Sequence, residues 1–247
     1  MIFYFSGTGN SRYVAEHLSE ILQVSAVSIP DAIKDCNADA VTDDAVGIVS
    51  PVYFYGLPTI VSDFISRKEF NAGKIFSVLT YGTTPGNASS VLKKEFAKKG
   101  IEVRHTFTIK MPENYTPLFR IPDEEERNRL FTNAETYMGR IPELLRTDGY
   151  HEKKSIAAPI MTAVAYPFYE YGRTTKKFKV TNECTGCSLC ERICPVNVIS
   201  VKDGRPQWTA DKCIKCLACI HRCPSQAIRI GGSHKRGQYV NPYVNLE

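Results

Sequence analysis

The chain has 247 residues, 43% of them hydrophobic, which is long enough to bury a sizeable core and to form more than one domain. This length argues against a small disulfide-stapled secreted protein. The net charge of +5 is uneven, because residues 1–172 carry 18 basic and 21 acidic side chains and residues 173–247 carry 13 and 5. The chain opens on an apolar run without a basic leader, so we expect it to remain in a reducing cytoplasm.

The first part of the chain predicts a strand, a tight loop, a helix and a second strand. Residues 2–5 are apolar, the loop occupies residues 6–11, apolar residues then recur at helical spacing, and residues 24–29 form the second strand. Glycines and hydroxyls at a helix start surround an anion with backbone N–H groups, so a phosphate fits this loop. The loop lacks the lysine of nucleoside-triphosphatase loops and the dinucleotide glycine pattern. An ordinary capped turn is the remaining alternative.

A second loop, residues 50–58, follows a continuous apolar strand at residues 45–49, of the kind that parallel sheets bury. Three consecutive aromatic residues lie between prolines in this loop, and a rigid turn there leaves at least one ring exposed. A flat apolar ligand such as a flavin ring would pack on these side chains. The alternative is packing on the following helix, residues 57–66, which we expect for Phe54.

A third loop, residues 81–87, follows a strand at residues 74–80 and precedes a helix at residues 88–99. It therefore lies at the same edge of the sheet as the first two loops. A fifth strand is expected at residues 101–111, and a long helix with an acidic start at residues 123–146. These elements predict a doubly wound α/β fold with a parallel five-stranded sheet.

The loop Ser6-Gly7-Thr8-Gly9-Asn10-Ser11 resembles the phosphate loop of the flavodoxins, which holds the phosphate of FMN without a basic residue. The resemblance implies a flavodoxin-like FMN-binding domain over residues 1–146, with the strands of its sheet in the order 2-1-3-4-5. It implies the phosphate ligands Ser6, Thr8, Gly9, Asn10 and Ser11. It also implies ring contacts from the other two loops, namely Pro51, Val52, Tyr53, Phe54, Tyr55, Gly56, Thr80, Tyr81, Gly82 and Asn87. The peptide of Gly56 is the candidate partner of flavin N5.

Eight of the nine cysteines form two runs with the same spacing, and the second run begins 29 positions after the first. Each run reads Cys-x2-Cys-x2-Cys-x3-Cys-Pro. Two-residue gaps let one loop supply three corners of a 4Fe-4S cluster, and in two-cluster ferredoxins the fourth cysteine of each run ligates the other cluster. We therefore expect one cluster on Cys184, Cys187, Cys190 and Cys223. The second is expected on Cys213, Cys216, Cys219 and Cys194.

Zinc is the alternative occupant, because paired Cys-x2-Cys sites also bind zinc. Residues 181–231 resemble the bacterial-type two-cluster ferredoxins, which implies a small α+β domain at residues 179–232 with a pseudo-twofold repeat. In that domain Trp208 is expected to be a packing anchor. The ninth cysteine, Cys36, is interpreted as an incidental thiol. Because the clusters would offset the basic charge of this half, we expect no nucleic-acid partner.

Two further segments complete the predicted organisation. Residues 147–178 form a connector whose apolar stretch, residues 156–171, contains two prolines and is too short for a membrane span. We expect this stretch to pack the two domains together. Residues 233–247 are polar and basic, which predicts a loosely ordered C-terminal tail.

The joint pattern resembles the flavodoxin–ferredoxin fusion proteins of anaerobic bacteria and archaea. This implies an electron carrier between FMN and two 4Fe-4S clusters, serving a redox partner such as a ferredoxin, a reductase or a larger oxidoreductase. The alternative is an FMN-dependent reductase of a small substrate, with the clusters as electron input. The five histidines are scattered along the sequence and no nicotinamide fingerprint occurs, so no catalytic residue is assigned. A sensor would need a further binding module, which the sequence does not indicate.

Overall fold

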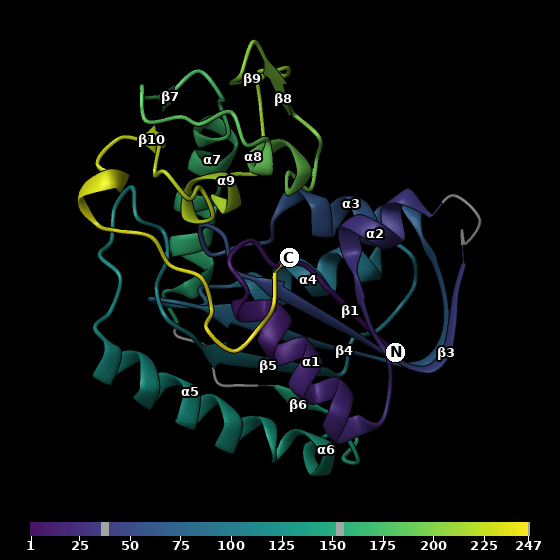
Figure 1. Cartoon of the computed structure of the whole chain (residues 1–247). Coiled ribbons are helices and arrows are strands. Elements are labelled where there is room, and N and C mark those ends of the chain that lie inside the picture. Colours follow the sequence, from purple (N-terminus) through teal and green to yellow (C-terminus); the bar gives the residue numbers. More distant parts are fainter. Residues whose placement is uncertain (36–39, 152–155, 247) are drawn as a thin grey trace.

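A parallel β-sheet forms the centre of the computed structural model, which describes residues 1–35, 40–151 and 156–246 (Figure 1). Its strands are β1 (Ile2–Tyr4), β2 (Ala26–Ser28), β3 (Ala40–Pro51), β4 (Glu69–Tyr81), β5 (His105–Lys110) and β6 (Tyr150–His151). Their order is β2-β1-β3-β4-β5-β6, and every neighbouring pair is parallel. The predicted order 2-1-3-4-5 is therefore confirmed, and β6 adds a short strand at one edge. Cys36 lies outside the described residues.

Helices cover both faces of the sheet (Figure 1). One face carries α1 (Asn10–Leu22), α5 (Glu124–Met138) and α6 (Ile141–Leu144), and the other carries α2 (Ile29–Lys34), α3 (Thr59–Arg67) and α4 (Ala88–Ala97). The single helix predicted over residues 123–146 is wrong, because α5 ends at Met138 and α6 begins after a break. Pro142 lies at the start of α6, and a proline inside a continuous helix would remove a hydrogen bond and clash with the preceding turn.

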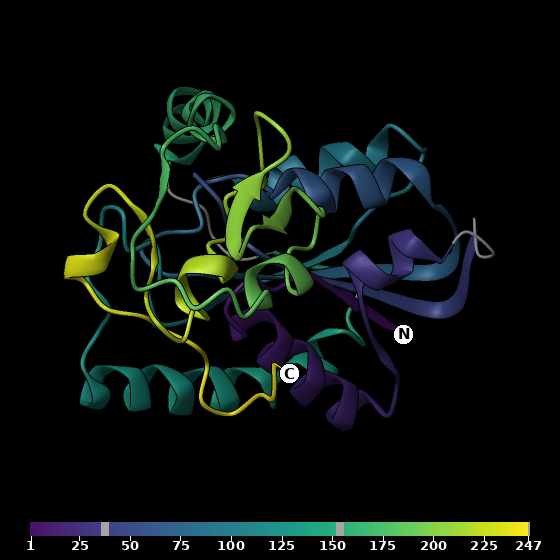
Figure 2. The same ribbon diagram turned by 45° about the horizontal axis from the view of Figure 1, so that its top comes forward.

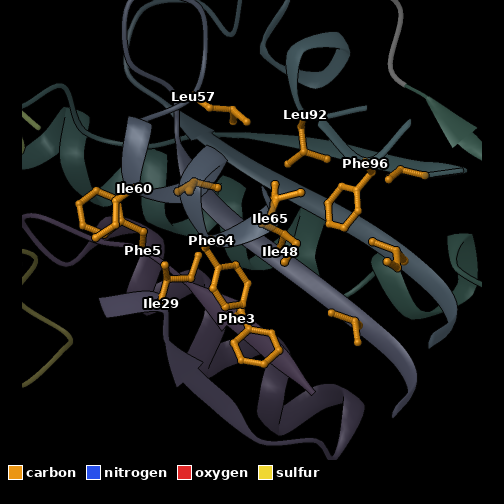
Figure 3. Close-up of a cluster of buried hydrophobic side chains, with 14 of the residues drawn as sticks. Phe3, Phe5, Ile29, Ile48, Leu57, Ile60, Phe64, Ile65, Leu92 and Phe96 are labelled. Atoms are coloured by element: carbon orange, nitrogen blue, oxygen red, sulfur yellow. The ribbon is translucent and has the colours of Figure 1, made fainter. Parts of the chain in front are cut away.

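The alternation of side chains along the strands divides the core into two layers. Phe3 and Ile48 point toward α3 and α4, as Figure 3 shows, whereas Ile2 and Val49 point toward α1 and α5. Strands β3 and β4 extend beyond the predicted ranges because residues 40–44 pair with residues 69–73 where many side chains are exposed. Backbone hydrogen bonds hold that part of the ladder. Because these bonds do not require apolar side chains, the sequence shows no apolar run there.

The cysteine-rich part is a small α+β unit. Its elements are β7 (Phe178–Val180), α8 (Leu189–Arg192), β8 (Ile199–Lys202), β9 (Arg205–Trp208), α9 (Ala218–His221) and β10 (Ile228–Ile230). Strand β7 pairs antiparallel with β10, and β8 with β9. The ring of Trp208 stacks on Phe178 with 4.8 Å between ring centroids, which agrees with its expected packing role. Short helices α8 and α9 follow the two cysteine loops at equivalent positions, as the predicted repeat requires.

The connector contains one long helix, α7 (Ala158–Gly172), which lies beside the cysteine-rich part and is seen end-on at the top of Figure 2. Its Tyr169 is fully buried, and the Tyr169 hydroxyl donates to the carbonyl of Ile214, 2.9 Å away in the second cysteine run. The ring of Tyr169 also contacts Tyr53 and Phe54 of the sheet domain. The helix therefore packs the two parts together. No helix in the described ranges is long and apolar enough to span a bilayer.

The prediction of a loosely ordered tail is wrong. The segment after β10 crosses from the cysteine-rich part to the start of α1 (Figures 1 and 2). Tyr239 and Asn241 are buried there, and the Asn241 N–H donates to the carbonyl of Thr8 at 2.8 Å. His221 fastens the same segment, because its Nδ1 accepts from the Tyr239 N–H and its Nε2 donates to the carbonyl of Asn114. Asn241 and Thr8 lie more than 100 positions apart in the sequence, as do His221 and Asn114. Local composition could therefore not indicate these contacts.

Truncation of Phe64 should test the core layer shown in Figure 3. Phe64 is fully buried, and its ring centroid lies 4.9 Å from that of Phe3. We expect Phe64→Ala to lower the free energy of unfolding by about 3–5 kcal/mol, because the cavity adds to the lost transfer energy. Anaerobic urea unfolding followed by circular dichroism measures this change. Ile21→Ala, at a side chain 38% exposed, is the control and should cost less than about 1 kcal/mol.

Candidate functional site

A cavity of about 310 Å³ opens at the carboxyl edge of the sheet, where the three predicted loops meet. We call it the strand-end cavity. Most of the residues predicted to contact a flavin line it, and they come from all three loops. They are Ser6, Thr8, Asn10, Ser11, Pro51, Val52, Tyr53, Phe54, Tyr55, Thr80, Tyr81 and Gly82. Parallel strands end at one edge of the sheet, so these residues lie together although they are far apart in the sequence.

Three predicted contact residues lie outside the wall of this cavity. Gly9 lies under the tail, where a Cβ atom would come within 2.7 Å of Asn241. The N–H of Gly56 donates to the carbonyl of Tyr53 at 2.9 Å, so it is already engaged and is not presented to a flavin. Asn87 lies directly before α4, and its N–H donates to Oγ1 of Thr162 at 2.9 Å. The expected contact between the Gly56 peptide and flavin N5 is thus not the arrangement that this geometry offers.

The first loop presents its backbone to the strand-end cavity. Helix α1 begins after Gly9, whose φ of 101° only glycine adopts readily, and no side chain caps the helix. The first N–H groups of a helix have no partner within the helix, and the positive end of its dipole lies there. The hydroxyl of Ser6 accepts from the Gly9 N–H at 3.0 Å, which holds the loop in this shape. A phosphate group fits this uncapped helix start.

The side chains of Thr8 and Asn10 fasten the loop to other segments. Thr8 Oγ1 accepts from the Asn114 amide at 2.7 Å, and the Asn10 amide donates to the carbonyl of Pro112 at 3.0 Å. Oδ1 of Asn10 accepts from the Tyr239 hydroxyl at 2.6 Å and from the Asn241 amide at 3.2 Å. The sequence suggested these side chains as direct phosphate ligands. In the structure they position the backbone that would face the phosphate.

The aromatic loop is a tight turn closed by hydrogen bonds between Tyr53 and Gly56. Its two central residues, Phe54 and Tyr55, have φ values of 48° and 64°, which are costly for residues with side chains. The Phe54 ring stacks on Tyr169 of α7 with 6.0 Å between centroids, so its predicted packing on the following helix is wrong. Tyr166 of α7 donates to the carbonyl of Leu57 at 2.7 Å. The connector helix thus holds the strained turn from one side.

A fourth loop of the strand-end cavity was missed in the sequence. It follows β5 and supplies Met111, Pro112, Glu113, Asn114, Tyr115, Leu118 and Phe119. The Glu113 carboxylate organises it by accepting from the Asn114 and Tyr115 N–H groups and from the Thr83 hydroxyl. The position of this loop after a strand, at the edge already identified, was the signal that could have found it. Residues Ala165, Phe168 and Tyr169 of α7 also line the cavity, and no local pattern indicated them.

The eight cysteines of the two runs surround two separate hollows. The outer hollow is lined by Cys184, Cys187, Cys190 and Cys223. The inner hollow is lined by Cys194, Cys213, Cys216 and Cys219. Each hollow therefore takes three cysteines from one run and the fourth from the other run, which is the grouping that the spacing predicted. In the described part of the chain, no three His, Cys, Asp or Glu side chains converge on a site for a single metal ion.

The surroundings of the sulfur atoms suit thiolate ligands. Backbone N–H groups of Val198, Lys215 and Ala227 point at Sγ of Cys194, Cys213 and Cys223 at 3.4, 3.3 and 3.3 Å. Burial raises the pKa of the Cys190 thiol to about 11 and that of Cys216 to about 12. Such thiols give up their protons at neutral pH only when a bound metal compensates the charge. An all-sulfur donor set of this kind suits iron–sulfur clusters.

The strand-end cavity and the inner hollow share a wall. Lys215, Cys216 and Leu217 line both of them. Gly7 of the first loop packs directly on this wall, because a Cβ atom there would lie 2.5 Å from the carbonyl oxygen of Cys216. The outer hollow is lined only by residues of the cysteine-rich part, and its Cys187 is exposed. The inner hollow therefore adjoins the strand-end cavity, whereas the outer hollow shares no lining residue with that cavity.

Family comparisons match the two parts of the chain separately. The model of the flavodoxin domain matches residues 1–120, and the model of the 4Fe-4S dicluster domain matches residues 183–228. Among solved structures, the two-electron reduced flavodoxin of Megasphaera elsdenii is similar over 56% of this chain and 99% of its own, with 16% identity and a TM-score of 0.32.

Several ferredoxins are similar to the C-terminal part. Ferredoxin-3 of Chlorobaculum tepidum is 40% identical over 58 residues, and Ferredoxin-2 of the same organism is 36% identical over 56 residues. Each match covers 20% of this chain and 90% of the ferredoxin. A component of the ion-translocating oxidoreductase complex of Methanosarcina acetivorans is 38% identical over 47 residues, which span 18% of that protein. The chain belongs to the flavodoxin–ferredoxin fusion proteins, with a flavodoxin domain followed by a 4Fe-4S dicluster ferredoxin domain.

Proposed function

We propose that this chain passes electrons between an FMN in the strand-end cavity and two 4Fe-4S clusters in the inner and outer hollows. A bound flavin exchanges one or two electrons and a cluster exchanges one, so the loaded chain would couple two-electron to one-electron redox partners. In this proposal residues 1–146 bind the flavin and residues 179–232 hold the clusters. Residues 147–178 and 233–247 fasten the two parts together.

The residues present fit an FMN. The uncapped start of α1 would hold the phosphate through backbone N–H groups, without a basic side chain. The rings of Tyr53, Tyr55 and Tyr81 line the same cavity and would pack against a flat apolar ring system. The strained turn at Phe54 and Tyr55 supports a binding role, because strain of this kind concentrates at functional sites.

The shared wall between the strand-end cavity and the inner hollow carries the proposal. Cys216 lines both, so a flavin and an inner cluster would be separated by little more than one residue. The exposed Cys187 in the outer hollow supports an exit at the surface. The inferred order is flavin, inner cluster, outer cluster and then a redox partner, such as a ferredoxin, a reductase or a larger oxidoreductase in anaerobic metabolism. Cysteines that ligate clusters rather than form disulfides suit a reducing cytoplasm.

Anaerobic purification with cofactor analysis tests the proposal directly. We expect about eight iron and eight sulfide per chain, as two 4Fe-4S clusters require, together with one FMN. Mixing the reduced protein with a one-electron acceptor should then oxidise flavin and clusters together. Zinc in place of iron, or a chain without flavin, would contradict the proposal. Saturable turnover of one small substrate would instead favour the FMN-dependent reductase, for which the open cavity also leaves room.

Replacement of the fourth cysteine of each run by alanine tests the crossed ligation. Cys194→Ala should abolish the same cluster signal in electron paramagnetic resonance as Cys213→Ala, because both side chains line the inner hollow. Cys223→Ala is the matched control and should abolish the signal that Cys187→Ala abolishes. Each variant should fall from about eight to about four iron atoms per chain. Loss of one and the same signal in Cys194→Ala and Cys187→Ala would show that the ligation is not crossed.

Removal of the two hydrogen bonds that the tail donates to Asn10 tests whether the tail positions the backbone of the first loop for FMN. In the double variant Tyr239→Phe, Asn241→Ala, the buried Oδ1 of Asn10 loses both donors. We expect FMN affinity to fall about tenfold, since an unsatisfied buried acceptor costs roughly 1–3 kcal/mol. Fluorescence titration with FMN measures the change, and iron content should stay constant.

Tyr243→Phe is the matched control for that variant. Its ring packs on Tyr13 and Phe131, and these ring contacts are kept when the hydroxyl is removed. We expect unchanged FMN affinity in this control. Equal affinity in the double variant and the wild type would show that the tail does not position the first loop.

A further inference from the structure

Lys215 occupies an unusual place between two predicted cluster ligands. It lies between Cys213 and Cys216 in the wall of the inner hollow, and only 6% of it is exposed. Lysine is seldom buried to this extent unless its charge is paired. Among the described residues no carboxylate forms an ion pair with Lys215, whereas nearby Arg173 and Lys212 both pair with Glu170. The inner hollow thus has a buried cation that no acidic side chain neutralises.

The repeat shows that lysine is not required by the loop. The equivalent position of the first run, 29 residues earlier, is Gly186, and both residues have left-handed backbones, with φ of 69° at Gly186 and 58° at Lys215. Glycine adopts this region without steric cost, but a residue with a Cβ atom does not. The second run therefore keeps a lysine where the backbone favours glycine. Strain retained in this way points to a role for the side chain.

The two loops differ in what surrounds this position. A Cβ atom at Gly186 would lie 2.9 Å from the carbonyl oxygen of Gly204, so the loop of the first run has no room for a side chain at this position. In the loop of the second run, the Lys215 ammonium donates to the carbonyl of Thr174 at 3.3 Å and lies 5.0 Å from the centre of the Phe178 ring. Both partners belong to the segment that leads into and forms β7. They hold the ammonium at a fixed place beside the inner hollow.

Lys215 lines the inner hollow together with Cys213 and Cys219. A fixed positive charge beside a cluster stabilises the reduced form, which carries one more electron than the oxidised form. Burial strengthens this effect, because solvent and salt screen buried charges much less than exposed ones. The outer hollow has glycine at the same position and therefore lacks this contribution.

We propose that Lys215 raises the reduction potential of the inner cluster and so favours an electron on the inner rather than the outer cluster. The proposal rests on the proposed function, since it requires both hollows to hold clusters. The step concerned is the transfer of one electron, in which the outer cluster is oxidised and the inner cluster is reduced. In this role Lys215 acts through its charge on the inner cluster, although it also lines the strand-end cavity. Its effect would favour electron movement toward the flavin.

Redox titration of the full chain, followed by electron paramagnetic resonance, tests this role. We expect Lys215→Gln, which removes the charge, to lower the reduced-to-oxidised ratio of the inner cluster about tenfold at a fixed potential, or about 59 mV for a one-electron couple. The outer cluster should not shift. Lys215→Arg keeps the charge and should stay close to the wild type. Lys215→Gly copies the first run, relieves the backbone and should shift like Lys215→Gln.

Lys212→Gln is the matched control, because it removes the same charge beside Cys213 from a side chain that is 58% exposed. The reduction potential of the inner cluster should shift clearly less in Lys212→Gln than in Lys215→Gln. An unchanged inner potential in both Lys215→Gln and Lys215→Gly, an equal shift of both clusters, or an equal shift in Lys212→Gln would overturn the inference. Iron and sulfide are measured in the same samples. A wild type without two clusters refutes the proposed function, whereas full clusters without the shift refute only the role of Lys215.

Discussion

The contact between Gly7 and Cys216 is the constraint on which the rest of the structure depends. A Cβ atom at Gly7 would lie 2.5 Å from the Cys216 carbonyl oxygen, so the first loop of the sheet domain packs backbone to backbone on the second cysteine run. Because side chains do not separate the two loops, the strand-end cavity and the inner hollow share a wall. Proximity of this kind is what electron exchange between a flavin and a cluster requires.

Three segments hold this contact in place. Helix α7 binds the second cysteine run through the Tyr169 hydroxyl and supports the strained aromatic turn through its rings. His221 joins α9 to the fourth loop and to the tail, and burial lowers its pKa to about 4, so the ring stays neutral and uses one nitrogen as donor and the other as acceptor. The tail closes over the first loop through Asn241. The connector and the tail therefore belong to the site.

The two cysteine runs show how one local plan serves two environments. Ser188 and Leu217 are equivalent by position and share a left-handed backbone, as do Asn197 and Gln226. The second run nevertheless packs on the sheet domain, and its Cys213 and Cys219 are buried, whereas Cys187 of the first run is exposed. Local sequence is enough to shape each loop, because its three closely spaced cysteines and its turn residues lie within one short segment, whereas the fourth cysteine of each hollow comes from the other run. The difference in burial and charge comes from what packs against the loop.

The sequence by itself determined most of the alternating strands and helices of the sheet domain, the meeting of three loops at one edge and the division of the cysteines into runs. These features follow from periodicity and spacing within short segments. Tertiary structure decided the rest. The Gly56 N–H is engaged by Tyr53, the side chains of Thr8 and Asn10 fasten their loop to other segments, and the tail packs over the first loop. These outcomes depend on contacts between residues as far apart as Asn10 and Asn241, which no local pattern encodes.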